Sequence, residues 1–177
     1  MSITVIDYGS GNLKSVAKAL ETAASDINMS SKIVVTSDPK IIKQSDKIVL
    51  PGQGSFRDCY LGIKKISGLN ETLNEFVLVK KKPIFGICVG MQLFAKTGYE
   101  SQETKGFGWI DAEVRKINNI NKKLKLPHMG LNEIELKKIV FSFLILKINL
   151  ICILFIVMNL WQNKKTVSLL RLIMVIQ

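Results

Sequence analysis

The sequence predicts an α/β fold in three layers, with a mostly parallel sheet that carries helices on both faces. Short apolar runs suited to buried strands alternate with segments whose apolar residues recur at helical spacing. Glycine-rich or reactive stretches follow the ends of several of these strands, where sheets of this kind collect ligands. The 177 residues are enough for one domain with a substantial core.

The N-terminal half contains three predicted strands separated by helices. The strands are Ile3–Ile6, Lys32–Thr36 and Lys47–Leu50. A helix is predicted from Leu13 to Ala24, because apolar residues recur there every three or four positions. The pair Asp38-Pro39 predicts the start of a short helical turn.

The following segment continues the alternation. Helical patterns cover residues 56–66 and 70–81, a strand covers 83–87, and a further helix begins after Cys88. Residues 106–116 predict a pair of strands. Strands that alternate with helices form parallel sheets, because each helix returns the chain to the same edge.

The charge and cysteine content exclude several classes of protein. The formal net charge is +11, but residues 137–177 contribute six basic and no acidic residues, so the rest is only modestly basic. This distribution argues against nucleic-acid binding. Cysteines 59, 88 and 152 are too widely spaced for a metal motif or a disulfide framework, so we expect no metal or cofactor. The N-terminus has no signal-peptide pattern, which predicts a cytoplasmic protein.

Cys88 is the strongest candidate for a catalytic residue. It follows an apolar strand, begins a helix and lies between Gly86 and Gly90. A glycine-flanked turn of this kind exposes a nucleophile, and the new helix offers free N–H groups to an oxyanion and favours the thiolate. The alternative is a buried core cysteine, the usual fate of an isolated Cys. The two glycines favour the catalytic interpretation.

Two other glycine-containing loops end predicted strands. Residues 51–54, Pro-Gly-Gln-Gly, are either a simple turn or a source of N–H donors for the same oxyanion. Residues 8–12, Tyr-Gly-Ser-Gly-Asn, lack the spacing of a phosphate-binding loop. We therefore interpret residues 8–12 as a tight turn or as a surface used by a partner.

Together these stretches resemble the triad (class I) glutamine amidotransferases, and most closely the glutaminase subunits of imidazole glycerol phosphate synthase. The resemblance covers residues 1–136 and rests on these segments: 7–12, 50–56, 86–92, 106–108 and 126–130 followed by Asn132-Glu133. The run Leu-Pro-His-Met-Gly at 126–130 is the most specific of them.

The resemblance implies a glutaminase mechanism. Cys88 would attack the carboxamide of glutamine, form a thioester and release ammonia. The N–H of Val89 and one from the loop at Gly52, Gln53 and Gly54 would form the oxyanion hole. Gln92 and Glu100 would hold the glutamine.

The resemblance also implies a partner. The family forms a heterodimer with a (β/α)8-barrel cyclase, which uses the ammonia to make imidazole glycerol phosphate in histidine biosynthesis. The residues that would lie toward this partner are Asn12, His128, Met129, Gly130 and Asn132. The chain departs from the family at Gln53, where Val is more common, and at Leu131, where Trp is usual.

The catalytic base of the family is absent from this sequence. It belongs to a Phe-His-Pro-Glu run near the C-terminus, whereas the one histidine here, His128, matches a structural and interface position. We therefore predict that the 177-residue chain has no measurable glutaminase activity.

Residues 137–177 differ from the rest in composition. They contain no Ala, Gly, Pro, Asp, Glu, His or Tyr, and Ile139–Trp161, with one charged residue, is long enough for a membrane span. The degenerate codons for residues 151–159 can also be read in the frame that starts one nucleotide earlier. In that frame they permit Asp-Leu-Tyr-Phe-Val-His-Ser-Tyr-Glu, which resembles a run of the family. We therefore interpret 137–177 as an out-of-frame product that leaves the sheet incomplete, and we do not expect a membrane anchor.

Three alternatives stay open at the level of sequence. The chain could be a partner-binding protein without catalysis, a membrane-associated remnant, or a glutaminase of another triad amidotransferase.

Overall fold

A computed structural model of the chain describes residues 1–116, 128–133, 151–156 and 158–162. A four-stranded parallel sheet forms its centre, with the strand order β2-β1-β3-β4. Its strands are β1 (Ser2–Ile6), β2 (Lys32–Thr36), β3 (Lys47–Gly52) and β4 (Ile84–Cys88). All four therefore point their carboxyl ends toward the same edge of the sheet, which is where the candidate site residues lie.

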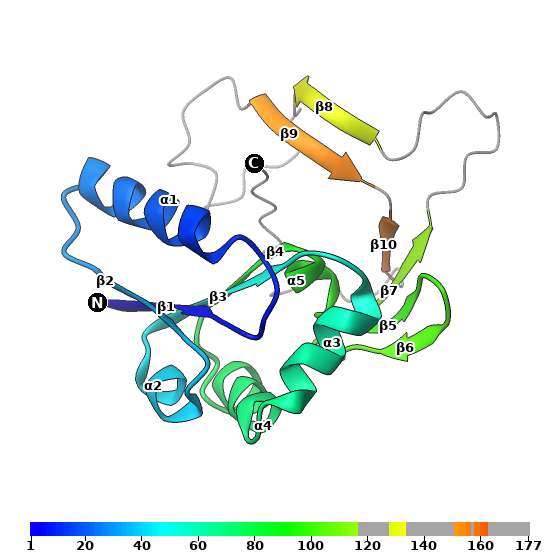
Figure 1. Cartoon of the computed structure of the whole chain (residues 1–177), viewed down its shortest axis with the longest axis horizontal. Coiled ribbons are helices and arrows are strands. Elements are labelled where there is room, and N and C mark those ends of the chain that lie inside the picture. Colours follow the sequence, from blue (N-terminus) through cyan, green and yellow to red (C-terminus); the bar gives the residue numbers. More distant parts are fainter. Residues whose placement is uncertain (117–127, 134–150, 157, 163–177) are drawn as a thin grey trace.

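Helices cover both faces of this sheet (Figure 1). One face carries α1 (Leu13–Asp26), whose apolar side packs on Ile3, Val5 and Val49. The other carries α2 (Pro39–Gln44), α3 (Phe56–Lys65), α4 (Leu69–Asn74) and the π-helical turn η1 (Glu75–Val79). The buried apolar residues form two clusters, one on each face of the sheet, because successive strand residues point to opposite faces. Ile48 and Leu50 belong to the larger cluster, under α2 to α4, and Val49 belongs to the smaller cluster, under α1.

Side-chain caps fix where the helices begin. The Asn12 side chain accepts a hydrogen bond from Ser15 N at 3.2 Å and starts α1. Asp38 does the same for α2, with Pro39 at the first helical position. Ser55 caps α3 by accepting from the N–H of Asp58. Each cap satisfies an N–H group that would otherwise lack a partner.

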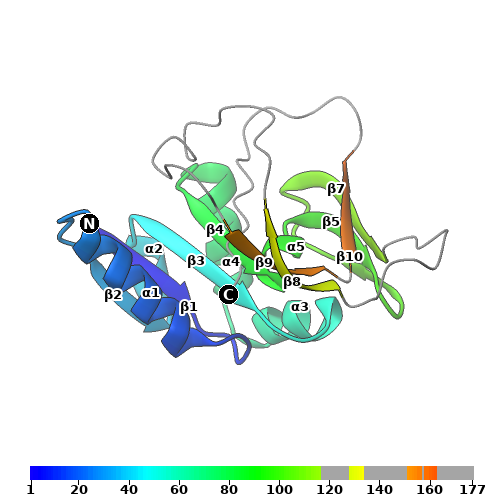
Figure 2. The same ribbon diagram turned by 90° about the horizontal axis from the view of Figure 1, so that it is seen from above.

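A second sheet lies beside the first (Figure 2). Its strand order is β10-β7-β5-β6, formed by β5 (Ala95–Tyr99), β6 (Glu103–Lys105), β7 (Ile110–Lys116) and β10 (Met158–Gln162). Trp109, just before β7, donates from Nε1 to Asn74 Oδ1 at 2.8 Å and stacks on Phe107 at 4.1 Å. These contacts join the second sheet to the helical layer.

The last described segments form a two-stranded antiparallel sheet. It pairs β8 (His128–Glu133) with β9 (Ile151–Ile156), and His128 lies opposite Ile156. Of the segment interpreted as out-of-frame product, only β9 and β10 fall in the described ranges; the remainder of 137–177 lies outside the described residues.

The predicted fold class is confirmed, and the differences are local. Residues 106–116 contain one strand, β7, rather than a predicted pair. The sequence pattern also missed β5 and β6, because these short strands contain glycine, lysine and glutamate instead of a continuous apolar run. The helical segment predicted for 70–81 is divided into α4 and the wider turn η1.

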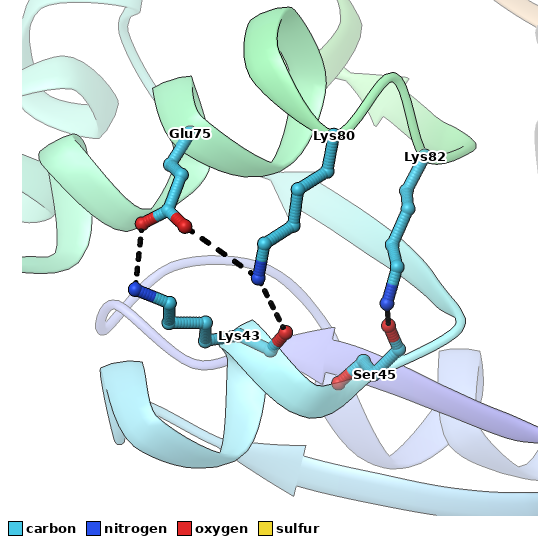
Figure 3. Close-up of polar contacts among 5 residues, drawn as sticks. All are labelled: Lys43, Ser45, Glu75, Lys80 and Lys82. Carbon is cyan, nitrogen blue, oxygen red and sulfur yellow. Dashed lines mark hydrogen bonds and ion pairs between the residues drawn. The ribbon is translucent and has the colours of Figure 1, made fainter.

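Lysine side chains cap the C-terminal end of α2 (Figure 3). Lys80 Nζ donates to the carbonyl of Lys43 at 3.2 Å, and Lys82 Nζ donates to the carbonyl of Ser45 at 2.6 Å. Glu75 pairs with Lys43 at 2.9 Å and with Lys80 at 3.5 Å. The segment before β4 is thereby tied to the segment before β3.

Within the described part of the chain, no helix combines the length and the apolar character that a membrane crossing requires. Most of Ile139–Trp161, the stretch whose composition would permit a span, lies outside the described residues.

Candidate active site

Cys88 ends β4 in a strained backbone conformation. Its φ is 54° and its ψ is −120°, a region that non-glycine residues rarely adopt. The helix α5 (Val89–Gln92) begins at the next residue. The thiol is therefore held at a sharp corner between strand and helix, as the sequence predicted, and the side chain is half-buried. Strain of this kind persists only where surrounding packing maintains it.

The glycines on either side of Cys88 permit this corner by allowing close backbone contact. A Cβ on Gly86 would lie 2.5 Å from Met91 Cα, and a Cβ on Gly90 would lie 2.0 Å from the carbonyl oxygen of Leu50. Neither distance is sterically possible. We refer to residues 86–90 as the elbow.

The loop that follows β3 packs directly against the elbow. In the parallel pairing of β3 and β4, Gly52 is the partner of Cys88. A Cβ on Gly52 would lie only 2.3 Å from the backbone nitrogen of Gly90. The structure therefore brings together Cys88, Val89 and the loop 51–54, which the sequence had proposed as one oxyanion site. We call residues 51–54 the oxyanion loop, after the role that the sequence predicts for them.

The loop after β1 holds the oxyanion loop from the other side. Ser10 Oγ accepts from the N–H of Gln53 at 2.9 Å and donates to the Gln53 carbonyl at 2.6 Å. The Tyr8 hydroxyl donates to the carbonyl of Pro51 at 2.5 Å. In this conformation the N–H of Gln53 therefore donates its hydrogen bond to Ser10, while Gly52 of the same loop faces the elbow.

Tyr8, Ser10 and Cys59 are the neighbours of the site that sequence analysis missed. The buried Cys59 thiol lies 3.5 Å from both Ser10 Oγ and the Gln53 carbonyl. The available signal was positional: residues 8–12 and 51–54 follow strands that share one edge of the sheet. Which side chains reach across that edge is not visible in the sequence.

Burial raises the pKa of the Cys88 thiol above its ordinary value. A hydrogen bond from the N–H of Val89 acts in the opposite direction, and the nearby Cys59 adds a smaller upward contribution. As predicted, the N–H at the start of α5 favours the thiolate, but burial outweighs this effect and the net shift of the pKa is upward. The physical reason is that α5 has only four residues, while desolvation of a half-buried thiolate is costly.

Gln92 and Glu100, the predicted glutamine-binding residues, lie on different segments of the chain. Gln92 ends α5 and is partly buried. The Glu100 carboxylate, just after β5, accepts from the backbone N–H of Phe56 at 2.8 Å. Since Phe56 begins α3 two residues after the oxyanion loop, Glu100 stands at the end of that loop. Its charge also suits the N-terminus of a helix.

The predicted partner-facing residues lie on two segments. Asn12 is exposed and caps α1. His128, Met129, Gly130 and Asn132 all lie on β8, in register with β9.

An open hollow of about 740 Å³ lies between residues 8–11, the oxyanion loop and α3. Ser10, Gly54, Asp58 and Lys65 contribute to its lining, and Cys88 does not. This hollow is therefore separate from the face of the elbow that carries the thiol. The described ranges hold no group of three or more His, Cys, Asp or Glu side chains placed to bind a metal ion.

A strained cysteine after a parallel strand, beside a glycine-rich loop from the neighbouring strand, is the geometry of an α/β protein with a nucleophile elbow. The model of the family "Glutamine amidotransferase class-I" matches residues 4–138, which is most of the sequence. The chain belongs to this family.

Individual relatives agree with this assignment. The imidazole glycerol phosphate synthase subunit HisH of Pelagibacter ubique (strain HTCC1062) is 54% identical over 138 residues, which are 78% of this chain and 65% of that protein. The protein of the same name from Bradyrhizobium diazoefficiens is 50% identical over 135 residues, 76% of this chain and 62% of that protein. The chain thus spans less than two thirds of the length of these curated relatives.

Solved structures share the fold. One is titled "Crystal structure of glutamine amidotransferase", with a TM-score of 0.52 and 14% identity, covering 73% of this chain and 62% of that one. Another is the glutaminase domain of Trypanosoma brucei CTPS with bound acivicin, also with a TM-score of 0.52 and 14% identity, covering 89% of this chain and 67% of that one.

Proposed function

We propose that this chain carries the nucleophile half of a glutaminase site whose ammonia serves an imidazole glycerol phosphate synthase. One observation supports this above all: Cys88 sits at a strained elbow with Gly52 of the oxyanion loop packed directly against it. Two relatives that are 54% and 50% identical to the chain are named as subunits of that synthase. The chain covers residues that correspond to the nucleophile, to its oxyanion donors and to the proposed glutamine contacts.

The proposed reaction uses Cys88 as the nucleophile. Its sulfur forms a bond to the carboxamide carbon of glutamine, and the resulting oxyanion accepts hydrogen bonds from Val89 N–H and the oxyanion loop. The carbon–nitrogen bond then breaks and ammonia leaves with the thiol proton. Water cleaves the thioester, releases glutamate and returns the proton to the sulfur. Gln92 and Glu100 hold the amino-acid end of glutamine in this proposal.

Proton transfer is the step for which the described residues supply no group. In a triad a histidine accepts the thiol proton and passes it to the leaving ammonia. The one histidine of the sequence, His128, lies on β8, and the family resemblance assigns it to an interface. This observation favours a second candidate function, a subunit that binds its partner without turnover.

The proposed partner is a cyclase subunit, a (β/α)8 barrel in a heterodimer with this chain. Asn12 and the four predicted residues of β8 would face it. We also propose that the chain is cytoplasmic, because a complex that passes ammonia between subunits for biosynthesis would work in that compartment.

Labelling with acivicin tests the nucleophile, because the reaction needs no turnover. The Cys88 sulfur would bond to C3 of the dihydroisoxazole ring while the carbon–chlorine bond breaks and chloride and the thiol proton are released. We expect one adduct by intact mass, absent in Cys88→Ala and retained in Cys59→Ala. Because burial raises the pKa of Cys88, the labelling rate should still be rising at a pH where an ordinary cysteine is fully ionised. An adduct that persists in Cys88→Ala would contradict the proposal.

Turnover is tested separately from labelling. We expect glutamate release by the 177-residue chain to equal that of Cys88→Ala, with and without the cyclase subunit. A fusion of residues 1–136 to the unmatched C-terminal third of the Pelagibacter relative should release glutamate in a Cys88-dependent manner. Failure of the folded fusion to do so would contradict the assignment of a glutaminase half-site. Co-purification of the full chain with the cyclase subunit would support the second candidate function if turnover is absent.

A further inference from the structure

Tyr8 is a buried tyrosine that connects the central core to the oxyanion loop. It follows β1 by two residues and is only 5% exposed, although Gly9 beside it is open to solvent. Its ring belongs to the larger apolar cluster, and its hydroxyl donates to the carbonyl of Pro51 at 2.5 Å. The proposed reaction assigns no role to this residue.

The hydroxyl of Tyr8 lies against the part of the oxyanion loop that touches the elbow. It is 3.0 Å from the place that a Cβ on Gly52 would occupy, and the same Cβ would be 2.3 Å from Gly90 N. The Tyr8 hydroxyl and the elbow therefore both border the space that a side chain at position 52 would occupy. Movement of the hydroxyl would therefore change the packing around Gly52.

A glycine in α3 makes room for the tyrosine ring. A Cβ on Gly62 would approach Tyr8 Cδ2 to 3.1 Å and the Tyr8 carbonyl oxygen to 3.0 Å. Gly62 belongs to neither the elbow nor the oxyanion loop. Because Gly62 has no side chain, the Tyr8 ring can pack closely against α3.

We propose that Tyr8 is a positioning residue for the reaction at Cys88: through the Pro51 carbonyl it fixes the backbone of Gly52 against the elbow, and so sets the direction of the loop's N–H groups. The inference rests on the proposed function, since it assumes that the oxyanion loop stabilises charge during attack by Cys88. The proposal is independent of Ser10, whose bonds go to Gln53 and not to Pro51.

The Tyr8 hydroxyl remains a hydrogen-bond donor over the whole working range of pH. Burial raises its pKa far above the ordinary value, and ionised Cys59 and Cys88 would raise it further. Ionisation of Cys88 therefore leaves the bond to Pro51 intact, and the effect of removing the hydroxyl should not depend on pH.

Two reagents that attack the same thiol separate positioning from simple reactivity. Acivicin requires stabilisation of the charge that develops on its ring, whereas iodoacetamide requires only an accessible thiolate. In the full-length chain, Tyr8→Phe should slow the maximal rate of acivicin labelling at Cys88 by about tenfold or more, with little change in the half-saturating concentration. The rate with iodoacetamide should change by less than about twofold.

Tyr60→Phe is the matched control. Tyr60 packs edge-on against Phe107 at 6.0 Å and is also partly buried, but it lies outside the site. Its variant should label at the wild-type rate with both reagents. Gly62→Ala is a second perturbation, because its methyl group presses on the Tyr8 ring without touching Pro51. It should change the ratio of the two rates in the same direction as Tyr8→Phe.

Hydrogen–deuterium exchange gives a readout that does not depend on glutamine chemistry. Tyr8→Phe should speed exchange in the peptide that contains residues 51–56 and leave the peptides of α1 and β2 unchanged. Unchanged exchange at 51–56, or an equal loss of rate with both reagents, would overturn the role assigned to Tyr8. Absence of acivicin labelling in the wild-type chain would instead count against the proposed function, while the exchange result would still decide the role of Tyr8.

Discussion

Cys88 occupies a backbone conformation that its neighbours must maintain. The positive φ carries a conformational cost, and the contacts made by Gly86 and Gly90 offset it by letting helix α5 approach β3 and β4 closely. The residue type at these two positions is set by the backbone atoms facing them. Reactivity and packing are thus determined by the same few residues.

Gly90→Ala should destabilise the fold strongly. The added Cβ would lie 2.0 Å from the Leu50 carbonyl oxygen, a backbone atom that cannot rotate away. We expect a loss of about 2–3 kcal/mol in the free energy of unfolding, typical of overpacking in a core, measured by urea denaturation. Gly68→Ala is the control, since it combines a positive φ with no contact closer than 3.8 Å and should cost about 1 kcal/mol. Equal losses in the two variants would contradict the steric argument.

At the scale of elements, the strands of the central sheet are aligned by contacts between the segments that precede them. Lys80 and Lys82, just before β4, bind carbonyl groups at the C-terminal end of α2, just before β3. Cationic groups near a helix C-terminus are favourable, because the last carbonyls lack partners within the helix. Glu75 orients Lys43 and Lys80 through ion pairs.

Glu75→Gln should reduce stability at neutral pH more than at acid pH. The hydrogen bond from Lys43 is the largest cause that lowers the pKa of Glu75. A lowered pKa in the folded state adds stability above the unfolded-state pKa, and this stability is lost as the pH falls through the folded-state pKa. The urea midpoints of wild type and variant should therefore differ at pH ~7 and converge by pH ~3. Glu21→Gln, which removes an exposed pair with Lys18 at 3.8 Å, should shift the midpoint little at either pH. A Glu75→Gln difference that does not change with pH would contradict this expectation.

At the scale of the whole molecule, two sheets with different strand directions share one core. The parallel sheet supplies Cys88, and the segment that contains β5 supplies Glu100. Trp109 joins the two units, because its ring stacks on Phe107 and its Nε1 group bonds to Asn74 of α4. Apolar packing from both sheets therefore controls the distance between the predicted nucleophile and a predicted substrate contact.

Trp109→Phe should weaken the connection between the sheets. The variant keeps an aromatic ring but leaves the Oδ1 atom of Asn74 without its donor, so we expect a loss of about 1–2 kcal/mol in the free energy of unfolding. A double-mutant cycle with Asn74→Ala should give a coupling energy of about 1 kcal/mol. Additive effects of the two substitutions would show that the bond does not stabilise the junction.

Much of this architecture could be predicted from the order of residues alone. The runs at β1 to β4 are short and apolar, the helices between them have a clear apolar period, and glycines flank Cys88. These signals are local, so they survive without knowledge of the tertiary structure. The strands β5 and β6 were missed because their stability comes from cross-strand pairing and from burial against Phe56, not from their own composition.

The sequence by itself determined the fold class, the strand-to-helix corner at Cys88 and the loop that faces it, because each depends on residue type and spacing along the chain. Only the tertiary structure decided that Tyr8 and Ser10 hold the oxyanion loop, that Glu100 meets the start of α3, and that the Cys88 pKa is raised and not lowered. The physical reason is that hydrogen bonds between segments far apart in sequence, and the burial of a thiol, depend on how the layers pack.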